Sequence, residues 1–347
     1  LSCSVFERSI NLLVKVADYY YIQGFSQREI ADILGVSVAT ISRLLSQARK
    51  NNIVSISLTP PYQECLALEQ TLNERFRIKE IIVAPFDETI DHSEDASAGS
   101  SSMLIPVRTH EDHYTPFEAK RSVALEAARY LQSIVQDDSV IGISWGGTIS
   151  MLVNFLNPCQ MASTSVVTMC ATISNFDFYQ SSQKVALRLS NVFKGQCYIL
   201  PYDTYQPSPE RMEFTLKLPG TVQMLSLLDK IDISISGVGS LHPYLDSGFA
   251  SPNFLPHAFY DEFINNEAVY GDLVNRFFDK DGNEIESPLS KLILGIDFKT
   301  YKKIPLKIVA TAGAFKVDTI LALLRGQLVD VLVIDQALAR TLVSRSN

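Results

Sequence analysis

The sequence predicts a two-domain α/β protein, in which a small helical domain precedes a larger domain built on a mainly parallel sheet. Apolar residues recur at helical spacing up to about residue 51, and Thr59-Pro60-Pro61 then interrupts the chain. Beyond this break, short apolar runs alternate with helical segments, which is typical of a parallel sheet covered by helices on both faces. A length of 347 residues also favours two domains, which we place at residues 1–58 and 62–347.

The composition is ordinary for a soluble protein with a sizeable core, since 46% of the residues are hydrophobic and 20% are charged. Apolar runs such as Val329–Ile334 are far shorter than the roughly 18 to 20 residues needed to cross a bilayer. Residues Leu1–Ile10 lack the basic and then apolar layout of a signal peptide. We therefore expect a cytoplasmic protein without membrane contacts.

The cysteines are spaced too widely for a zinc knuckle or a redox motif, and their odd number argues against a disulfide framework. Free cysteine is usually a small buried apolar residue, and we expect that role here, with no metal and no cofactor. The five are Cys3, Cys65, Cys159, Cys170 and Cys197.

The net charge of −8 is unevenly distributed. Residues 1–57 hold six basic and four acidic side chains, which gives +2 and leaves −10 for the remainder. Because nonspecific DNA affinity depends on local Lys and Arg contacts with phosphate, this mildly basic first domain is compatible with DNA binding.

Three helices are predicted in the first domain. The first spans residues 5–23, with Val14 on its buried face, and ends at Gly24. The second runs to Leu34 from a capping box, in which Ser26 and Glu29 each accept from the other's backbone N–H. Gly35-Val36-Ser37 then supplies a tight turn and an N-cap for a helix that extends to about Asn51, with Val38, Ile41, Leu44, Leu45 and Ala48 facing inward.

The spacing of small and branched residues is typical of a helix-turn-helix. Ala31 permits close approach of two helices, Gly35 takes the strained turn conformation, and Ile41 fills the crossing. The polar face of the third helix has base-reading residue types first and phosphate partners later. A helical hairpin with a merely solvated polar face is the alternative. We expect double-stranded operator DNA to contact Ser26, Gln27, Ser37, Ala39, Thr40, Ser42, Arg43, Arg49 and Lys50.

Residues Ile53–Leu58 alternate between apolar and polar side chains. This alternation predicts a short strand, which would form the wing of a winged helix-turn-helix.

The second domain opens with a predicted helix, Tyr62–Phe76, that suits either oligomerisation or simple core packing, and a strand, Glu80–Ala84. Asp, Glu, Ser and His dominate residues 86–116, where we expect a mobile acidic loop. Histidines in such a loop are usually solvated, so we expect no metal site at His92, His110 and His113.

From Phe117 onward strands and helices alternate regularly. In parallel sheets, ligands bind outside the carboxyl ends of the strands. The predicted strands are 139–143, 165–169, 197–200, 231–236, 269–270, 307–310 and 331–334. The predicted helical segments are 117–135, 149–157, 178–193, 209–228 and 315–325.

Three loops at these carboxyl ends have features of a phosphate site, although tight turns between strand and helix are the alternative for each one alone. Glycines that allow close backbone approach, followed by the free N–H groups of a helix N-terminus, favour an anion. Lys316 stands one turn into a helix after a strand, where it could meet a phosphate as a point charge. The residues concerned are Ser144, Gly146, Gly147, Thr148, Gly237, Gly239, Ser240 and Lys316.

Several stretches, in order and over nearly the whole chain, resemble the SorC family of sugar-responsive regulators: residues 27–45, 140–148, 231–240, 270–279 and 310–335. The resemblance implies a Rossmann-like sensor domain, similar to sugar-phosphate isomerases and glucosamine-phosphate deaminases, in a dimer or tetramer. It also implies that a phosphorylated sugar controls transcription of a carbohydrate-metabolism operon. Asp272 would then accept from sugar hydroxyls, and Lys316 would pair with a phosphate or carbonyl oxygen.

Two other functions stay open at this point. A sugar-phosphate isomerase or deaminase with an added DNA-binding domain would need a general acid and a general base, for which Asp272 and His242 are the candidates. The second of these functions is that of a DNA-binding protein that responds to no effector.

Overall fold

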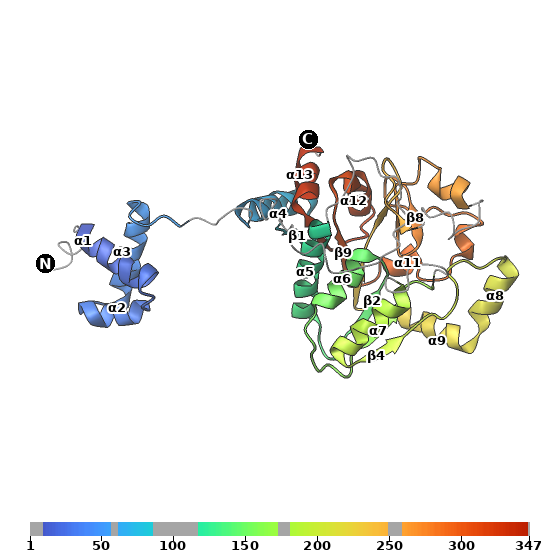
Figure 1. Cartoon of the computed structure of the whole chain (residues 1–347), viewed down its shortest axis with the longest axis horizontal. Coiled ribbons are helices and arrows are strands. Elements are labelled where there is room, and N and C mark those ends of the chain that lie inside the picture. The colour runs from blue at the N-terminus through green and yellow to red at the C-terminus, as the bar shows by residue number, and fades with distance from the viewer. Residues whose placement is uncertain (1–9, 57–61, 86–116, 173–180, 249–258, 346–347) are drawn as a thin grey trace, which may run out of the picture. The chain divides into compact units, whose positions relative to one another are not determined.

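The computed structural model describes residues 10–56, 62–85, 117–172, 181–248 and 259–345. The predicted acidic loop at 86–116, with its three histidines, lies outside these ranges. Backbone contacts divide the chain into two units, Leu1–Pro60 and Pro61–Asn347, which we call the head and the body. Each is described by itself (Figure 1).

The head is built from four helical segments around one small core. They are α1 (Ile10–Ala17), the π-helix η1 (Asp18–Ile22), α2 (Gln27–Leu34) and α3 (Val38–Lys50). Both α1 and α2 pack against α3. The fully buried members of this core include Leu13, Val16, Ile30, Ile41, Leu44, Leu45 and Ala48.

Two apolar residues of the head lie elsewhere than the helical spacing predicts. Val14 is 48% exposed, because α1 is only about two turns long and its neighbours Leu13 and Val16 already fill the face toward the core. Val38 is 45% exposed, because it is the first residue of α3 and precedes the turn that meets α2.

The predicted wing strand is wrong over its described part, Ile53–Ile56, which forms no strand. Asn52 adopts a left-handed conformation, with φ 53°, and donates its N–H to the Arg49 carbonyl. The Ile53 N–H donates to the Ala48 carbonyl at 2.9 Å. These two bonds form a Schellman cap, so the backbone donors needed for strand pairing instead close α3.

A seven-stranded sheet forms the centre of the body, and its expected parallel character is confirmed. Its strand order is β1-β10-β9-β5-β2-β3-β4, and every pair is parallel. The bounds are β1 (Glu80–Ala84), β2 (Val140–Ile143), β3 (Ser165–Thr168), β4 (Gln196–Tyr198), β5 (Ile233–Ser236), β9 (Leu306–Thr311) and β10 (Val331–Asp335).

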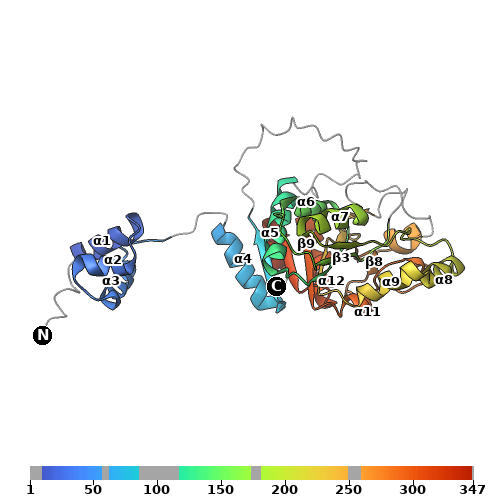
Figure 2. The same ribbon diagram turned by 90° about the horizontal axis from the view of Figure 1, so that it is seen from below.

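Helices cover both faces of this sheet (Figure 2). One face packs on α5 (Phe117–Ile134), α6 (Gly147–Phe155) and α7 (Ser182–Phe193). The other packs on α4 (Tyr62–Phe76), α8 (Pro209–Lys217), α9 (Pro219–Leu228), α11 (Phe298–Tyr301), α12 (Val317–Arg325) and α13 (Gln336–Arg345). Successive residues of β10 contribute alternately to the two cores, as the strand periodicity requires.

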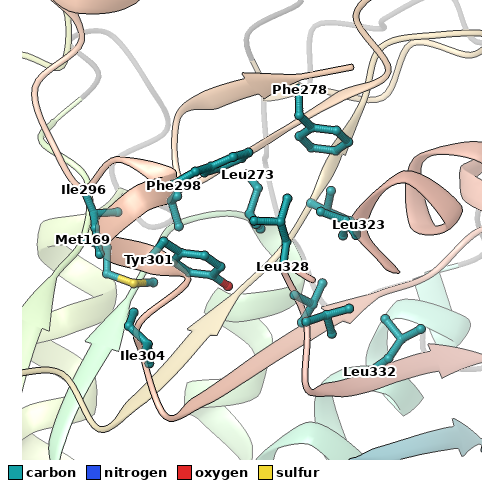
Figure 3. Close-up of a cluster of buried hydrophobic side chains, with 14 of the residues drawn as sticks. Met169, Leu273, Phe278, Ile296, Phe298, Tyr301, Ile304, Leu323, Leu328 and Leu332 are labelled. Atoms are coloured by element: carbon teal, nitrogen blue, oxygen red, sulfur yellow. The ribbon is translucent and has the colours of Figure 1, made fainter. Parts of the chain in front are cut away.

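A second sheet of three short antiparallel strands extends the body beyond β5. The predicted strand at 269–270 is shifted by two residues, to β7 (Gly271–Leu273), where it pairs with β6 (Gly239–Ser240) and β8 (Arg276–Phe278). Phe278 and Leu273 join the larger apolar core beside Tyr301 and Leu323 (Figure 3). Three further helical segments are η4 (Tyr260–Ile264), η5 (Ser290–Leu292) and η6 (Ala314–Lys316).

Among the described residues, no helix combines the length and apolarity that crossing a membrane would require.

Candidate DNA interface and candidate effector site

Side-chain caps and one glycine fix the two crossing helices of the head. The Ser26 hydroxyl accepts from the Glu29 N–H at 3.3 Å, and the Glu29 carboxylate accepts from the Ser26 N–H at 2.8 Å, which completes the predicted capping box. The Ser26 backbone N–H holds the pKa of Glu29 below its usual value. Gly35 takes the left-handed conformation, with φ 63°, and ends α2.

The outward face of α3 presents the predicted DNA-contacting side chains to solvent. Ala39, Ser42, Arg43, Arg49 and Lys50 are exposed. Arg49 and Lys50 occupy the last turn, where positive charge is favoured by the helix dipole.

Three predicted DNA contacts have structural roles as well. Ser37 is the N-cap of α3 and accepts from the Thr40 N–H at 3.2 Å. The Thr40 hydroxyl lies 2.9 Å from the Ser37 hydroxyl, and Thr40 is half-buried. Ser26 caps α2, and the adjacent Gln27 begins that helix and is half-buried. Thr40 is therefore less accessible than Arg43 on the next turn.

The three predicted phosphate loops come together in the body. They follow β2, β5 and β9, which are adjacent and parallel, so all three loops leave the same edge of the sheet. Gly237 follows β5, which is the middle strand of the three, and therefore lies between β2 and β9. A Cβ atom placed on it would lie 4.0 Å from the Trp145 carbonyl oxygen and 3.9 Å from the Ala310 carbonyl oxygen.

The loop after β2 forms the N-terminus of α6. Gly146 is the N-cap, with φ 123°, a conformation that L side chains rarely adopt. Gly147 and Thr148 begin the helix, and first-turn N–H groups have no partner inside a helix. Ser144 is buried and donates its backbone N–H to the Ile235 carbonyl at 3.1 Å. This loop therefore presents backbone donors suited to an anion.

Lys316 is already engaged within the protein. Its side chain is 8% exposed, and the ammonium pairs with the Asp246 carboxylate at 2.8 Å. It also donates to the Val238 carbonyl at 3.0 Å, which ties the loop after β9 to the loop after β5. The sequence placed Lys316 correctly on the loop after β9 but did not reveal this internal anion.

Asp272 lies against the backbone of the loop after β5. It pairs with Gly239 across the small sheet, and a Cβ atom on Gly239 would lie 2.0 Å from an Asp272 carboxylate oxygen. Only glycine fits this approach. The Ser247 hydroxyl donates to Asp272 at 2.5 Å. Burial raises the pKa of Asp272 to about 6.

Ser240 completes this network. Its hydroxyl donates to the Tyr244 carbonyl at 2.6 Å and accepts from the Thr319 hydroxyl at 3.0 Å. Ser240 is buried, so it positions the loop after β5 rather than presenting a free hydroxyl.

Three further residues, Lys120, Asp246 and Ser247, lie at this site without any signal in the sequence. Burial lowers the pKa of Lys120 in α5, and the nearby Asp246 opposes that shift. Lys316, in turn, lowers the pKa of Asp246. Within the amphipathic pattern of α5, Lys120 is one basic residue beside Arg121, so the sequence carries no signal for its role.

The two residues considered for acid–base chemistry have separate partners. The Nε2 atom of His242 lies 3.1 Å from the Ile264 carbonyl oxygen, whereas Asp272 accepts from Ser247. Neither contact forms a pair of facing acid and base. Within the described residues, no group of His, Cys, Asp and Glu side chains could hold a metal ion.

Comparisons with known proteins agree with both halves of this description. The family model described as "Putative sugar-binding domain" matches residues 60–344, which is most of the chain. The model for sigma-70 region 4 matches residues 19–51, the part of the head that contains α2 and α3.

Two curated proteins are similar over nearly their whole length. The sorbitol operon regulator of Klebsiella pneumoniae is 27% identical over 347 residues, covering 96% of this chain and 98% of that protein. The deoxyribonucleoside regulator of Bacillus subtilis is 26% identical over 336 residues, covering 96% and 97%. The crystal structure of the full-length sorbitol operon regulator SorC from Klebsiella pneumoniae has the same fold, with a TM-score of 0.68 at 24% identity, and covers 96% of this chain and 99% of that one.

Proposed function

The chain belongs to the SorC family of sugar-responsive transcription regulators, and from this premise we propose that a phosphorylated sugar bound to the body controls how the head binds operator DNA. The regulated genes would form a carbohydrate-metabolism operon. The observation that carries the proposal is that three loops leave adjacent parallel strands at one edge of the sheet, where the Lys316 ammonium joins the loop after β9 to the loop after β5. Their chemistry suits an anionic group attached to a polar ligand.

The body offers two kinds of partner to such a ligand. The N-terminus of α6 and Lys316 supply donors and positive charge for a phosphate. Asp272 supplies carboxylate oxygens that accept from sugar hydroxyls, and Ser247 holds this carboxylate in place. A neutral sugar would use only the second set, so the phosphate should provide most of the discrimination.

The head supports sequence-specific DNA binding through α3. We expect Arg43, in the first half of α3, to read bases, and Lys50, its last residue, to contact phosphate. One such head reads too few base pairs for useful specificity, so we expect a dimer or tetramer on repeated half-sites. Light scattering at micromolar concentration, with and without operator DNA, tests this. Finding only the 38.6 kDa monomer would contradict it.

Titration calorimetry with matched sugars and sugar phosphates tests the effector. The phosphorylated member of a pair should bind, and Lys316→Ala should remove that preference while leaving DNA affinity intact. Lys217→Ala is the matched control, because Lys217 is exposed and pairs with Glu213 on its own helix. Equal affinity for both members of a pair, or an unchanged phosphate preference in Lys316→Ala, would contradict the proposal.

The same titration separates a sensor from an enzyme. A sensor returns the bound sugar phosphate unchanged, and ligand binding raises the melting temperature. An enzyme converts it. For a sensor, the factor by which effector changes DNA affinity must equal the factor by which DNA changes effector affinity.

A further inference from the structure

The Asp246 carboxylate pairs with a lysine that comes from a distant part of the chain. Its Oδ2 atom lies 2.8 Å from the Lys316 ammonium, which follows β9. The charge of Lys120, on α5, also acts on Asp246. The Lys316 ammonium is therefore an anion site that the protein itself has filled.

The backbone holds Asp246 in that position. The Asp246 N–H donates to the Ser240 carbonyl at 2.8 Å, and the Ser240 N–H donates to the Asp246 carbonyl at 3.0 Å. Asp246 thereby forms an isolated antiparallel bridge to the end of β6. Its carboxylate is 35% exposed, so it can be reached from solvent, whereas the Lys316 side chain beneath it is 8% exposed.

We propose that Asp246 is a built-in competitor for the effector, occupying the anion position that the ligand's phosphate takes when it binds. This inference rests on the proposed function, because it assigns a regulatory role to a residue of the same site. A phosphate dianion carries more charge than the carboxylate and has more acceptor oxygens. It can therefore satisfy the Lys316 ammonium more fully than the carboxylate does, which gives it the advantage over Asp246.

Displacement of Asp246 would also affect the part of the site that is proposed to bind the sugar hydroxyls. The next residue, Ser247, donates to Asp272, and the Asp272 carboxylate rests against Gly239. A shift of the 246–247 backbone therefore changes how the carboxylate that accepts from the sugar is held. The phosphate would displace Asp246, and the sugar hydroxyls would bind Asp272, which Ser247 holds. A sugar phosphate would therefore act on both residues of the 246–247 segment, whereas a free sugar or a free anion would act on one of them.

The test is a phosphate titration of the full chain with the competitor neutralised. Asp246→Asn should bind inorganic phosphate about tenfold more tightly than the native protein, because a site that is open only about a tenth of the time loses that factor in affinity. Asp246→Ala should also bind inorganic phosphate more tightly than the native protein does. Asp246→Glu keeps the charge and should not gain affinity. Asp318→Asn is the matched control, since Asp318 pairs with Arg345 on the surface of the body.

Equal or weaker phosphate binding by both Asp246→Asn and Asp246→Ala would overturn the inference, since it would make Asp246 a ligand or an anchor. If neither variant folds, the native protein decides. In a crystal soaked with phosphate, the Asp246 carboxylate should lie beyond 4 Å from the Lys316 ammonium, and a pair retained at 2.8 Å beside bound phosphate overturns the inference. Tighter phosphate binding by Asp246→Asn without binding of any sugar phosphate would instead contradict the proposed function alone.

Discussion

The head and the body present their charged residues in opposite ways. On α3, Arg43, Arg49 and Lys50 are exposed and face outward. In the body, Lys316 and Asp272 are buried, and each has an internal partner. Recognition by the head therefore adds new contacts to a preformed surface, whereas recognition by the body must replace contacts that already exist. This difference predicts additive, salt-dependent effects in the head and coupled effects in the body.

The sharpest test of the contrast is a buried cation of the body that lies outside the proposed effector site. Arg276 donates to the carbonyls of Ser290, Ile293, Gly295 and Ile296, and pairs with Glu284 at 3.4 Å. Arg276→Ala should destabilise the body by about 3–5 kcal/mol, because it leaves these groups buried without their partner. Hydrogen exchange should show lost protection across the body and none lost in the head.

The control for this experiment is Arg325→Ala. Arg325 is exposed and donates to the Lys280 carbonyl, so its removal should change stability by no more than about 0.5 kcal/mol. A loss below 1 kcal/mol for Arg276→Ala would show that the body tolerates unpaired buried groups as readily as a surface does.

The next largest effect concerns Asp272 and pH. Burial raises the pKa of Asp272 from 3.8 to about 6, so between these values the folded protein keeps a proton that the unfolded chain releases. The free energy of unfolding should therefore fall as pH rises through this window, by an amount on the order of 3 kcal/mol. Asp272→Asn should lack this fall. Denaturant titrations of both proteins at pH 4 and pH 7 measure the difference.

If the free energy of unfolding of the native protein instead rises relative to that of Asp272→Asn over the same pH window, the pKa of Asp272 is lowered by folding and not raised. The carboxylate would then be stabilised by Lys316 and Ser247 more than it is penalised by burial.

In the head, the expected effects are on DNA affinity and are smaller. Arg43→Ala should cost about 1–3 kcal/mol on operator DNA and relax sequence preference, because a base contact is lost. Lys50→Ala should weaken all sequences alike and flatten the salt dependence by about one unit. Fluorescence anisotropy on operator and random DNA, over a range of salt, distinguishes them. Equal losses on both DNAs for Arg43→Ala would remove its base-reading role.

The smallest effect tests the capping box. Ser26→Ala should destabilise the head by about 0.5–2 kcal/mol, since the Glu29 N–H loses its acceptor. Thermal unfolding, followed with a spectroscopic probe in the head, measures this loss of stability. Ser46→Ala, on the exposed face of α3, should change stability by about 0.5 kcal/mol or less. Similar losses in the two variants would mean that the box contributes nothing specific.

The sequence predicts best where a local rule decides the structure. The capping box at Ser26 and Glu29 and the left-handed Gly35 follow from residues a few positions apart, and both are present. The alternation of strands and helices likewise predicts the parallel sheet, with the three loops at the carboxyl ends of its strands, whereas the adjacency of β2, β5 and β9 is known only from the structure. DNA and effector contacts of individual side chains stay predictions.

The sequence predicts poorly where distant residues decide. Nothing in the sequence pairs Lys316 with Asp246, which lies 70 positions earlier. The wing prediction failed for a local reason instead. Alternation at Ile53–Leu58 satisfies the strand pattern, but Asn52 ends α3 with a left-handed cap that takes up the next backbone donors.

The pairing of β1 with β10 has a consequence for synthesis on the ribosome. The head is complete once about 56 residues have emerged, whereas the strand partner of β1 within the described residues is β10, close to the far end of the chain. At 5–20 residues per second, that wait lasts on the order of 10 to 60 s. During it, the edge of β1 is an open template for non-native pairing, and long-range parallel pairing is slow even when the partner has arrived. A chain released before Val331 therefore carries a finished head and an unfinished body, which makes it a substrate for chaperones and proteases.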